Sequence, residues 1–435
     1  MPFGGPRQRA LSIAFCAAAL LFFFQNRAAY KGYFSADDLV NLGWPTFVGN
    51  DVFIDGLLSP KFDNDNFRPV GYAYYRYAGR AFQLDFPPYV AIVQFLHLLN
   101  AALLFFLLET LGFSSVVAGM GAVFFGFNAV ILEAYWKPMY IFDVLCCTFC
   151  LATLILYLRG RWIAALIPFW LAYKSKEVAV MLPVGLAACE FFIGERKWKR
   201  LIPFFAISFS FGAQAMLHNR AVDSLSDYAI SFAPQALWKS LSFYSSAIFF
   251  VPFAGLAIFA LPLFIRDKRL YIGLAITASM LLPMLGLFNR LRAVYWYVPL
   301  IGVAVVIAVI GSRLQRWAVV LAIVLWLPLN YAAVREKRRE VLAMADESRW
   351  FLTGLQQFKR SAGPLKAIVY EDTPQHLHVG IDAAIQLVFG RNVESAWIED
   401  PKARTLMNDV PMAVVTWYAP AHEVRAKLRT SAAAQ

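Results

Sequence analysis

Two adjacent aspartates, Asp37 and Asp38, follow the first apolar segment of the chain. A carboxylate at a membrane face can act as a general base on a hydroxyl group, provided that it lies within hydrogen-bonding reach of that hydroxyl. Two acids at the start of a helix are also favoured by the helix dipole, without any role in catalysis. The pair therefore predicts either a base or an ordinary helix start, and the surrounding residues must decide.

Further charged and aromatic side chains gather at the ends of apolar segments. Ionisable groups at membrane depth are costly, so they usually face a cavity and serve a function. A guanidinium such as that of Arg68 can hold a phosphate through two parallel hydrogen bonds. Singly, each residue could be a snorkelling or capping side chain, but their clustering favours a site. The residues expected to bind substrate are Arg68, Lys137, Asp143, Lys176, Glu177, Arg292 and Tyr295.

The elements that must position these residues are membrane helices. The chain has 435 residues, of which 60% are hydrophobic and 16% are charged, and its mean hydropathy is +0.56. About 20 apolar residues are needed to cross the hydrocarbon core of a bilayer as a helix. We therefore predict an all-α polytopic membrane protein. Its expected spans, about eleven by this criterion, are residues 10–30, 88–109, 114–133, 138–158, 161–173, 177–193, 201–218, 241–265, 270–288, 293–311 and 316–334.

The distribution of Lys and Arg predicts the orientation. Basic clusters at 159–161, 196–200, 266–269 and 313–316 fall on one side, which the positive-inside rule makes cytoplasmic, together with the N-terminus. The first apolar run lacks a clean cleavage site, so we interpret it as an uncleaved helix rather than a signal peptide. A fifth cluster, 335–339, would lie outside, so either the rule fails there or the count of spans is off by one.

The chain divides into two predicted parts. Residues 1–334 form the transmembrane domain, whose first periplasmic loop spans 31–87 and holds the aspartate pair. Residues 335–435 are more polar and are expected to form a small soluble α/β domain on the periplasmic side. Its expected strands and helix are residues 367–370, 412–418 and 382–389.

Two pairs of polar residues lie outside this set. His97 and Asn100 are three residues apart in the second span and so share one helical face. We interpret them as a buried hydrogen-bonded pair rather than as catalytic groups. His376 and His378 lie two residues apart in the polar tail, which is a weak hint of a metal site.

Five sequence blocks resemble those of GT-C-type integral-membrane glycosyltransferases, especially the protein O-mannosyltransferase-like branch and its bacterial relatives. The resemblance covers residues 30–311. The most specific block is Ser175-Lys176-Glu177-Val178-Ala179-Val180-Met181-Leu182-Pro183, which is similar to the family's Ser-Lys-Glu-Thr-Ala-x-x-x-Pro run. The others are Asp37-Asp38, Phe67-Arg68-Pro69-Val70 followed by His97-Leu98-Leu99-Asn100-Ala101, Glu133 with Asp143, and Tyr295-Trp296-Tyr297-Val298-Pro299.

The chain departs from the family pattern at two basic positions. Val294 stands where family members place an arginine directly before the first tyrosine of the last block, and Ile141 stands where they carry another. Arg292 or Lys137 could substitute as a cation for the donor phosphate. The polar tail does not resemble the TPR arrays of some relatives.

The resemblance implies an inverting transferase that takes a sugar from a polyprenyl-phosphate donor. Asp37 or Asp38 would be the catalytic base, and basic residues would hold the departing lipid phosphate. The implied partners are the lipid-linked sugar, membrane lipids, and a protein, lipid or glycan acceptor at the periplasmic face of the bacterial inner membrane. No metal is required, although some relatives use a divalent ion, for which the two aspartates could be ligands. No nucleic-acid motif is present. The net charge of +12 is explained by basic loops that anchor the protein at the anionic lipids of the cytoplasmic face.

Two other functional classes share these features. A transporter or flippase of lipid-linked sugars should show inverted repeats with Gly/Pro-broken spans in matching halves, and we find none in the sequence. A non-catalytic GT-C-like scaffold is a third possibility, because Val294 and Ile141 stand where the family carries arginines. The sequence leaves open the sugar, the acceptor, the need for a metal, which aspartate is the base, and the oligomeric state.

Overall fold

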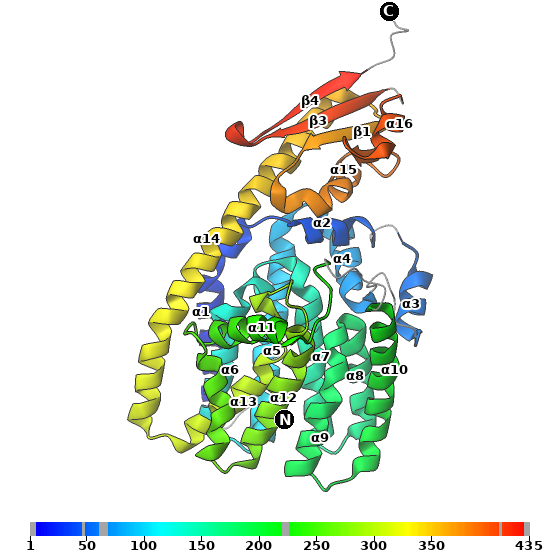
Figure 1. The fold of residues 1–435 in the computed structure, drawn as a ribbon. Helices are drawn as coiled ribbons and strands as arrows, with labels where there is room; N and C mark the ends of the chain where they lie inside the picture. Colours follow the sequence, from blue (N-terminus) through cyan, green and yellow to red (C-terminus); the bar gives the residue numbers. More distant parts are fainter. Residues whose placement is uncertain (1–5, 46–47, 61–67, 220–225, 409–410, 430–435) are drawn as a thin grey trace, which may run out of the picture.

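The structure is a computed structural model that describes residues 6–45, 48–60, 68–219, 226–408 and 411–429. A bundle of helices forms the larger part, and a small sheet with its own helices stands above one end of it (Figure 1). The main bundle helices are apolar on nearly every face, which is typical of helices buried in protein and lipid together. They are α5 (Phe86–Thr110), α6 (Ser115–Phe127), α7 (Ile141–Leu158), α8 (Trp162–Ser175), α9 (Leu182–Phe192), α10 (Ile202–Asn219), α12 (Lys268–Leu285) and α13 (Leu300–Arg313).

Within the part of the chain that the structure describes, five helices are each long and apolar enough to cross a membrane. They are Ala10–Lys31, Phe86–Thr110, Pro138–Leu158, Lys268–Leu285 and Trp317–Ala362. A sixth would be α6 together with the 3-10 helix η2 (Ala129–Tyr135), which are bent by 65° relative to each other. The chain therefore contains helices that can span a membrane, as predicted, whereas the count of eleven stays a prediction.

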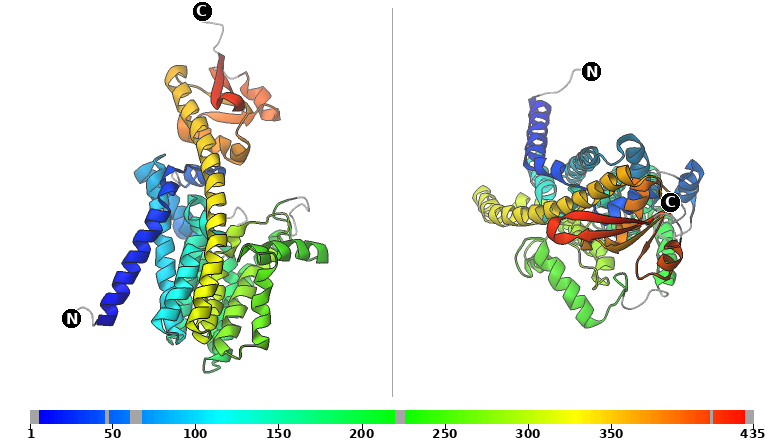
Figure 2. Two further views of the ribbon diagram at one scale, coloured as in Figure 1. Left: turned by 90° about the vertical axis from the view of Figure 1, so that its left-hand side faces the viewer. Right: turned by 90° about the horizontal axis from the view of Figure 1, so that it is seen from above.

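The segment 241–265, expected to be one span, is broken into two parts. Helix α11 (Pro234–Ala247) ends inside it, and the 3-10 helix η6 (Ala254–Leu263) follows. Between them, Phe250 and Phe253 have left-handed backbones with φ of 61° and 57°, which a right-handed helix cannot contain. Figures 1 and 2 show α11 lying across the bundle rather than along it. The expectation of a single span is wrong here, because apolar composition does not reveal a change of direction.

Two helices lie on the outside of the bundle. α1 (Pro6–Gln25) leans away from it, and α14 (Arg316–Ala362) runs along the bundle and on to the sheet (Figure 2). Only 11% of the most apolar window of each is buried, and large side chains such as Leu20 and Leu325 stay exposed. Lipid would cover this surface, since soluble proteins rarely expose continuous apolar patches of such size. The expected domain boundary at 335 falls inside α14.

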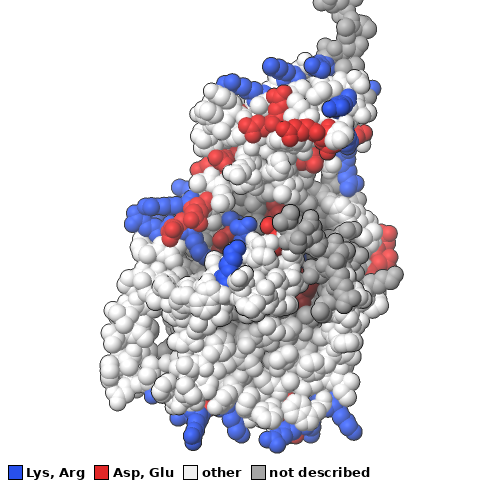
Figure 3. Space-filling view, in the orientation of Figure 1, with Lys and Arg blue, Asp and Glu red and all other residues white. Residues whose placement is uncertain are grey.

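On the face that Figure 3 shows, charged side chains avoid the middle of the bundle. The lower end of this face carries basic side chains. Asp267, which precedes α12, pairs with Arg269 and Arg313 at 2.8 and 3.5 Å. Both signs of charge gather between the bundle and the sheet. An uncharged band between two charged ends is the pattern that a bilayer requires. The 335–339 cluster lies at the upper end, where Arg338 donates to the last carbonyl of α1 at 2.7 Å.

The first outer loop, 31–87, is folded onto the bundle. Its helices are α2 (Ala36–Gly43), α3 (Asn50–Leu58) and α4 (Pro69–Phe82), preceded by the 3-10 helix η1 (Arg27–Lys31). Pro69 takes the first position of α4, where its fixed φ suits a helix and its missing N–H costs nothing. α4 packs against α7 and α8, so the residues that follow Arg68 form a helix that touches the bundle.

The C-terminal domain is a four-stranded sheet with the order β2-β1-β3-β4. β1 pairs in parallel with β2 and β3, and β4 runs antiparallel to β3. The expected α/β fold of the tail is confirmed, with two strands and one helix more than the sequence predicted. The elements are β1 (Ala367–Asp372), α15 (Ile381–Phe389), β2 (Glu394–Trp397), α16 (Pro401–Leu406), β3 (Met412–Tyr418) and β4 (Glu423–Arg429).

His97 and Asn100 are both fully buried, as expected, and both bond to Tyr297 rather than to each other. The Gly126 carbonyl lies 3.0 Å from Nε2 of the histidine and can only accept, so this nitrogen carries the proton. The Tyr297 hydroxyl therefore donates to Nδ1 at 2.7 Å and accepts from the Asn100 amide at 3.2 Å. This network ties α5 to the aromatic block that begins at Tyr295.

The C-terminal domain rests on α2. The 3-10 helix η8 (Gln375–Gly380) and α15 both pack against α2, so the helix that carries the aspartates lies under the domain (Figure 1). Gly380 approaches so closely that a β-carbon there would stand 2.6 Å from the carbonyl oxygen of Ala36. Glycine permits this approach because it has no side chain.

Replacing Gly380 by valine is expected to loosen the domain from α2, because the new side chain would overlap the Ala36 backbone. Overpacking of this kind costs about 1–3 kcal/mol, enough for about tenfold faster limited proteolysis near η8 in detergent. The control is Val379→Ala, since the Val379 side chain is 75% exposed. Equal proteolysis of the two variants would contradict the close contact.

Candidate functional site

Asp38 caps helix α2. One carboxylate oxygen accepts hydrogen bonds from the backbone N–H and the hydroxyl of Ser35, at 2.8 and 2.7 Å, in a capping box. The other oxygen accepts from the Tyr75 hydroxyl at 2.7 Å. Burial raises the pKa of Asp38 to about 6, and the hydrogen bonds from Ser35 and Tyr75 oppose that rise. One oxygen therefore caps α2, and the other holds α2 against α4.

Asp37 is differently placed. Its side chain is half-buried and forms no hydrogen bond or ion pair with any residue that the structure describes. Its charge lies within electrostatic reach of Arg290, which donates through Nε to the Tyr295 hydroxyl at 2.9 Å. Asp37 thus has carboxylate oxygens that no described residue occupies, as a general base requires.

Arg68 and Glu177 form a bidentate ion pair, with Nε to Oε1 at 2.7 Å and Nη2 to Oε2 at 2.9 Å. Arg68 precedes α4 and Glu177 opens the 3-10 helix η4 (Glu177–Met181), so the pair fastens the outer loop to the segment between α8 and α9. The two side chains are 24% and 30% exposed, which leaves one edge of the pair open. Phe67, the first residue of this sequence block, lies outside the described residues.

Lys176 and Asp143 form a second ion pair, with Nζ 2.6 Å from Oδ1. Their side chains are only 13% and 6% exposed. The ammonium also lies 5.0 Å from the centre of the Tyr295 ring, a cation–π distance. Tyr295 belongs to the 3-10 helix η7 (Ala293–Trp296), so α7, η7 and the end of α8 meet here. The charge of Asp143 also acts on Arg68, which makes the two ion pairs neighbours.

Three cations surround Glu133. Lys137 Nζ lies 2.9 Å from its Oε2, and the charges of Lys337 and Arg292 are within electrostatic reach. Lys337 comes from α14 and donates to the Val130 carbonyl at 3.1 Å. The Arg292 guanidinium is exposed and makes no hydrogen bond or ion pair among the described residues. We call these four charged residues the Glu133 cluster, in which positive charge exceeds negative charge by two.

Tyr140 connects the cluster to the ion pairs. Its hydroxyl lies 3.5 Å from Oε2 of Glu133, and the residue is within electrostatic reach of Asp143, Arg292 and Tyr295. All the site residues expected from the sequence therefore lie at one end of the bundle, in a continuous network. The structure separates their roles, since some are engaged with each other and only Asp37 and Arg292 are free of partners within the described part of the chain.

Cations lie near the two positions at which the chain departs from the family pattern. Val294 and Ile141 are buried, so an arginine at either position would need the local backbone to shift before it reached the site. Arg292 stands close by instead, and Lys337 reaches the cluster from α14. Sequence reasoning missed Lys337 as a site residue. Its signal was the basic cluster at 335–339, on the side where the orientation rule expects few cations.

Among the described residues, no group of three or more His, Cys, Asp and Glu side chains could hold a metal ion. Asp38 has both oxygens in hydrogen bonds, so the aspartate pair does not fit a hard cation, which prefers about six oxygen ligands. His376 pairs with Glu347 at 3.0 Å, whereas His378 packs on the ring of Trp397. The two histidines therefore face different partners.

Comparison with known proteins identifies the fold. No protein-family model matches the chain, and no curated protein sequence is significantly similar to it. Among solved structures, the chain is similar to ArnT from Cupriavidus metallidurans, solved bound to undecaprenyl phosphate. The TM-score is 0.54 at 12% sequence identity, over 97% of this chain and 98% of that one. The likeness is one of fold, and it confirms the GT-C-type fold that the sequence blocks indicate.

Proposed function

We propose that the chain is an inverting glycosyltransferase of the bacterial inner membrane. It transfers a sugar from a polyprenyl-phosphate donor to a hydroxyl of a protein, lipid or glycan acceptor at the periplasmic face. The observation that carries the proposal is the free carboxylate of Asp37 in one network with the positively charged Glu133 cluster. The undecaprenyl phosphate bound to ArnT supports a donor of this class. The basic lower end favours a cytoplasmic N-terminus and a periplasmic C-terminal domain.

Asp37 is the base in this mechanism. It takes the proton of the acceptor hydroxyl while the hydroxyl oxygen bonds to the anomeric carbon of the sugar. The bond from that carbon to the phosphate oxygen breaks, and its electron pair stays on the phosphate. Attack from the face opposite the phosphate inverts the anomeric configuration. Asp38 is a positioning residue, because it holds the helix on which Asp37 sits.

The Glu133 cluster holds the departing lipid phosphate. The donor is a phosphodiester with one negative charge, and the released monoester carries about −1.5 to −2 at neutral pH. Two excess positive charges therefore attract the leaving group more strongly than they attract the bound donor. An interaction that strengthens toward the transition state is the kind that accelerates a reaction.

The two ion pairs form the wall between base and phosphate. The pair of Arg68 and Glu177 and the pair of Lys176 and Asp143 fix the outer loop against α7 and η4. The open edge of the Arg68–Glu177 pair can donate to and accept from sugar hydroxyls. The ring of Tyr295 adds an apolar face beside them.

Replacing Arg292 by alanine is expected to raise the KM for the lipid-linked donor by about 10–100-fold. A hydrogen bond to a charged group contributes about 1.5–3 kcal/mol, and each 1.4 kcal/mol is about tenfold. The measurement is the initial rate of polyprenyl phosphate release as a function of donor concentration. Arg159→Ala is the control, because Arg159 is an exposed cation at the opposite end of the bundle. A donor KM equal to that of the wild type would remove Arg292 from the phosphate site.

The activity itself is tested with purified protein in lipid vesicles, radiolabelled polyprenyl-phosphate sugars and an acceptor extract. Acceptor-dependent release of polyprenyl phosphate is expected. Movement of lipid-linked sugar across the vesicle membrane without release would reject the transferase and favour a transporter. If the folded protein shows no release and no movement, the result would favour a non-catalytic scaffold.

A further inference from the structure

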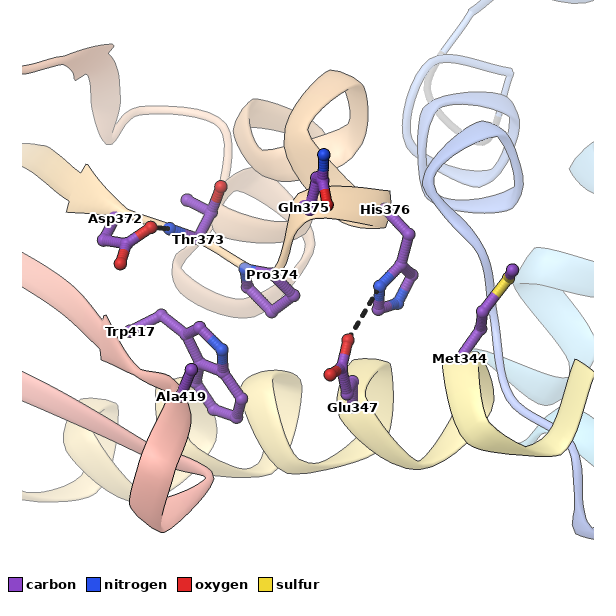
Figure 4. A pocket seen from close by; sticks show the side chains of 9 residues that line it. All are labelled: Met344, Glu347, Asp372, Thr373, Pro374, Gln375, His376, Trp417 and Ala419. Atoms are coloured by element: carbon purple, nitrogen blue, oxygen red, sulfur yellow. Dashed lines mark hydrogen bonds and ion pairs between the residues drawn. The ribbon is translucent and has the colours of Figure 1, made fainter. Parts of the chain in front are cut away.

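A cavity of about 560 Å³ lies between α14 and the C-terminal sheet. Figure 4 shows it bounded by residues of α14, by the C-terminal ends of β1 and β3 and by the segments that follow these strands. In the sheet, β2 and β3 lie on opposite sides of β1. The chain therefore leaves β1 toward one side and, after β2, crosses to the other side to form β3. In parallel sheets, ligands bind outside the carboxyl ends of the strands at such a switch point. The volume lies within the range of small-molecule sites.

The cavity lining offers hydrogen-bonding groups that the protein does not use. Trp417 is only 4% exposed, its indole N–H has no partner among the described residues, and Figure 4 shows the nitrogen facing the space in front of Glu347. Thr373 is also buried, and its hydroxyl likewise has no partner in the described part of the chain. Both groups therefore face the open cavity, where a ligand could replace water as their hydrogen-bonding partner.

The charge of the lining selects the chemistry of that ligand. Asp372 and Glu347 contribute carboxylates and Gln375 contributes an amide, whereas no Lys or Arg is among the described residues that line the cavity. A phosphate here would meet two negative charges and no positive one, which is unfavourable. A neutral sugar fits, because each hydroxyl can donate to a carboxylate and accept from an N–H or O–H group.

The cavity lies next to the catalytic site. Burial and the nearby charge of Lys137 lower the pKa of His376, which lines the cavity, and Glu347 opposes them. The helix η8 begins in the cavity and ends on Ala36, one residue before Asp37. At a rise of about 2 Å per residue, η8 spans roughly 10–12 Å. A molecule bound in the cavity can therefore extend to the base.

We infer that this cavity is the acceptor subsite, and that it binds an unphosphorylated sugar residue of a glycan. The bound residue brings a hydroxyl farther along the same molecule to Asp37. The inference rests on the proposed function and narrows its acceptor to a glycan with neutral sugars at this position. Trp417 and Asp372 are the residues that recognise those sugars.

Direct binding tests the subsite without any transfer reaction. The full-length protein in lipid nanodiscs is titrated with maltose, cellobiose, mannobiose and glucose 6-phosphate, and binding is followed by saturation-transfer difference NMR. At least one neutral disaccharide is expected to bind, and the phosphorylated sugar at least about tenfold more weakly. Trp417→Phe, which keeps a ring but loses the N–H, and Asp372→Asn should each weaken binding about tenfold. The control is Trp350→Phe, because Trp350 packs on His422 and does not line the cavity.

The outcomes separate this inference from the proposed function. No binding of any neutral disaccharide, or binding that Trp417→Phe and Asp372→Asn leave unchanged, would overturn the subsite. Polyprenyl phosphate release with an unchanged KM for the acceptor extract in both variants would also overturn it, while the transferase stands. Disaccharide binding that depends on Trp417 and Asp372, without any release, would support a sugar site here and reject the transferase.

Discussion

Replacing Asp37 by asparagine is expected to lower kcat by about 10²–10⁴-fold with little change in Tm. In the described structure Asp37 has no hydrogen bond or ion pair to lose, so the substitution removes only the proton acceptor. The carboxamide has nearly the same size but does not take a proton at neutral pH. The measurement is the rate of acceptor-dependent release of polyprenyl phosphate at saturating donor, beside a thermal melt in detergent.

Two matched variants make that result specific. Asp55→Asn is the same change on the exposed face of α3 and should leave kcat unchanged. Asp38→Asn disturbs three hydrogen bonds, so Tm should fall and the rate should fall with it as α2 loosens. A wild-type rate for Asp37→Asn, with a large loss for Asp38→Asn at unchanged Tm, would assign the base to Asp38 instead.

Replacing Asp143 by asparagine is expected to lower the free energy of unfolding by about 3–5 kcal/mol, because it leaves the Lys176 ammonium buried without its partner. Water cannot easily replace the carboxylate, since the two side chains are only 6% and 13% exposed. The cation–π contact with Tyr295 remains but contributes less than the ion pair. The loss is measured by thermal or SDS unfolding of the detergent-solubilised protein.

A double variant separates stability from function at this pair. Asp143→Asn combined with Lys176→Met removes both charges, so most of the unfolding free energy should return while sugar transfer stays low. The control is Lys197→Met, which breaks the exposed pair with Glu195 and should change stability by less than about 1 kcal/mol. Single and double variants of equal stability would contradict the burial of the pair.

Many helices of the bundle could be predicted, because a long apolar segment can adopt few structures in lipid. Backbone groups in a bilayer must be satisfied within the segment, so 88–109 and 138–158 could only become helices such as α5 and α7. The segment 241–265 is equally apolar, yet its chain turns at Phe250 and Phe253. Phenylalanine does not signal a left-handed backbone, so composition alone could not show the break.

The grouping of these charged residues was more predictable than their individual partners. Charged residues next to apolar segments are few, and all those singled out lie in one network. Arg68 and Glu177 are 109 residues apart, and no spacing rule pairs residues at such a distance. The Ser35-x-x-Asp38 spacing allows a capping box for Asp38 alone, but the contact of Asp38 with Tyr75 on another helix could not be read from the sequence.

A single helix of 47 residues joins the lower end of the bundle to the C-terminal sheet. At 1.5 Å per residue it is about 70 Å long, and a hydrocarbon core about 30 Å thick takes up fewer than half of its residues. The remainder is a stiff spacer that fixes the height of the sheet above the lipid headgroups. For the acceptor subsite that we infer, reach is therefore a second criterion of selection: the acceptor must extend far enough from the bilayer to meet the sheet, whatever its sugars.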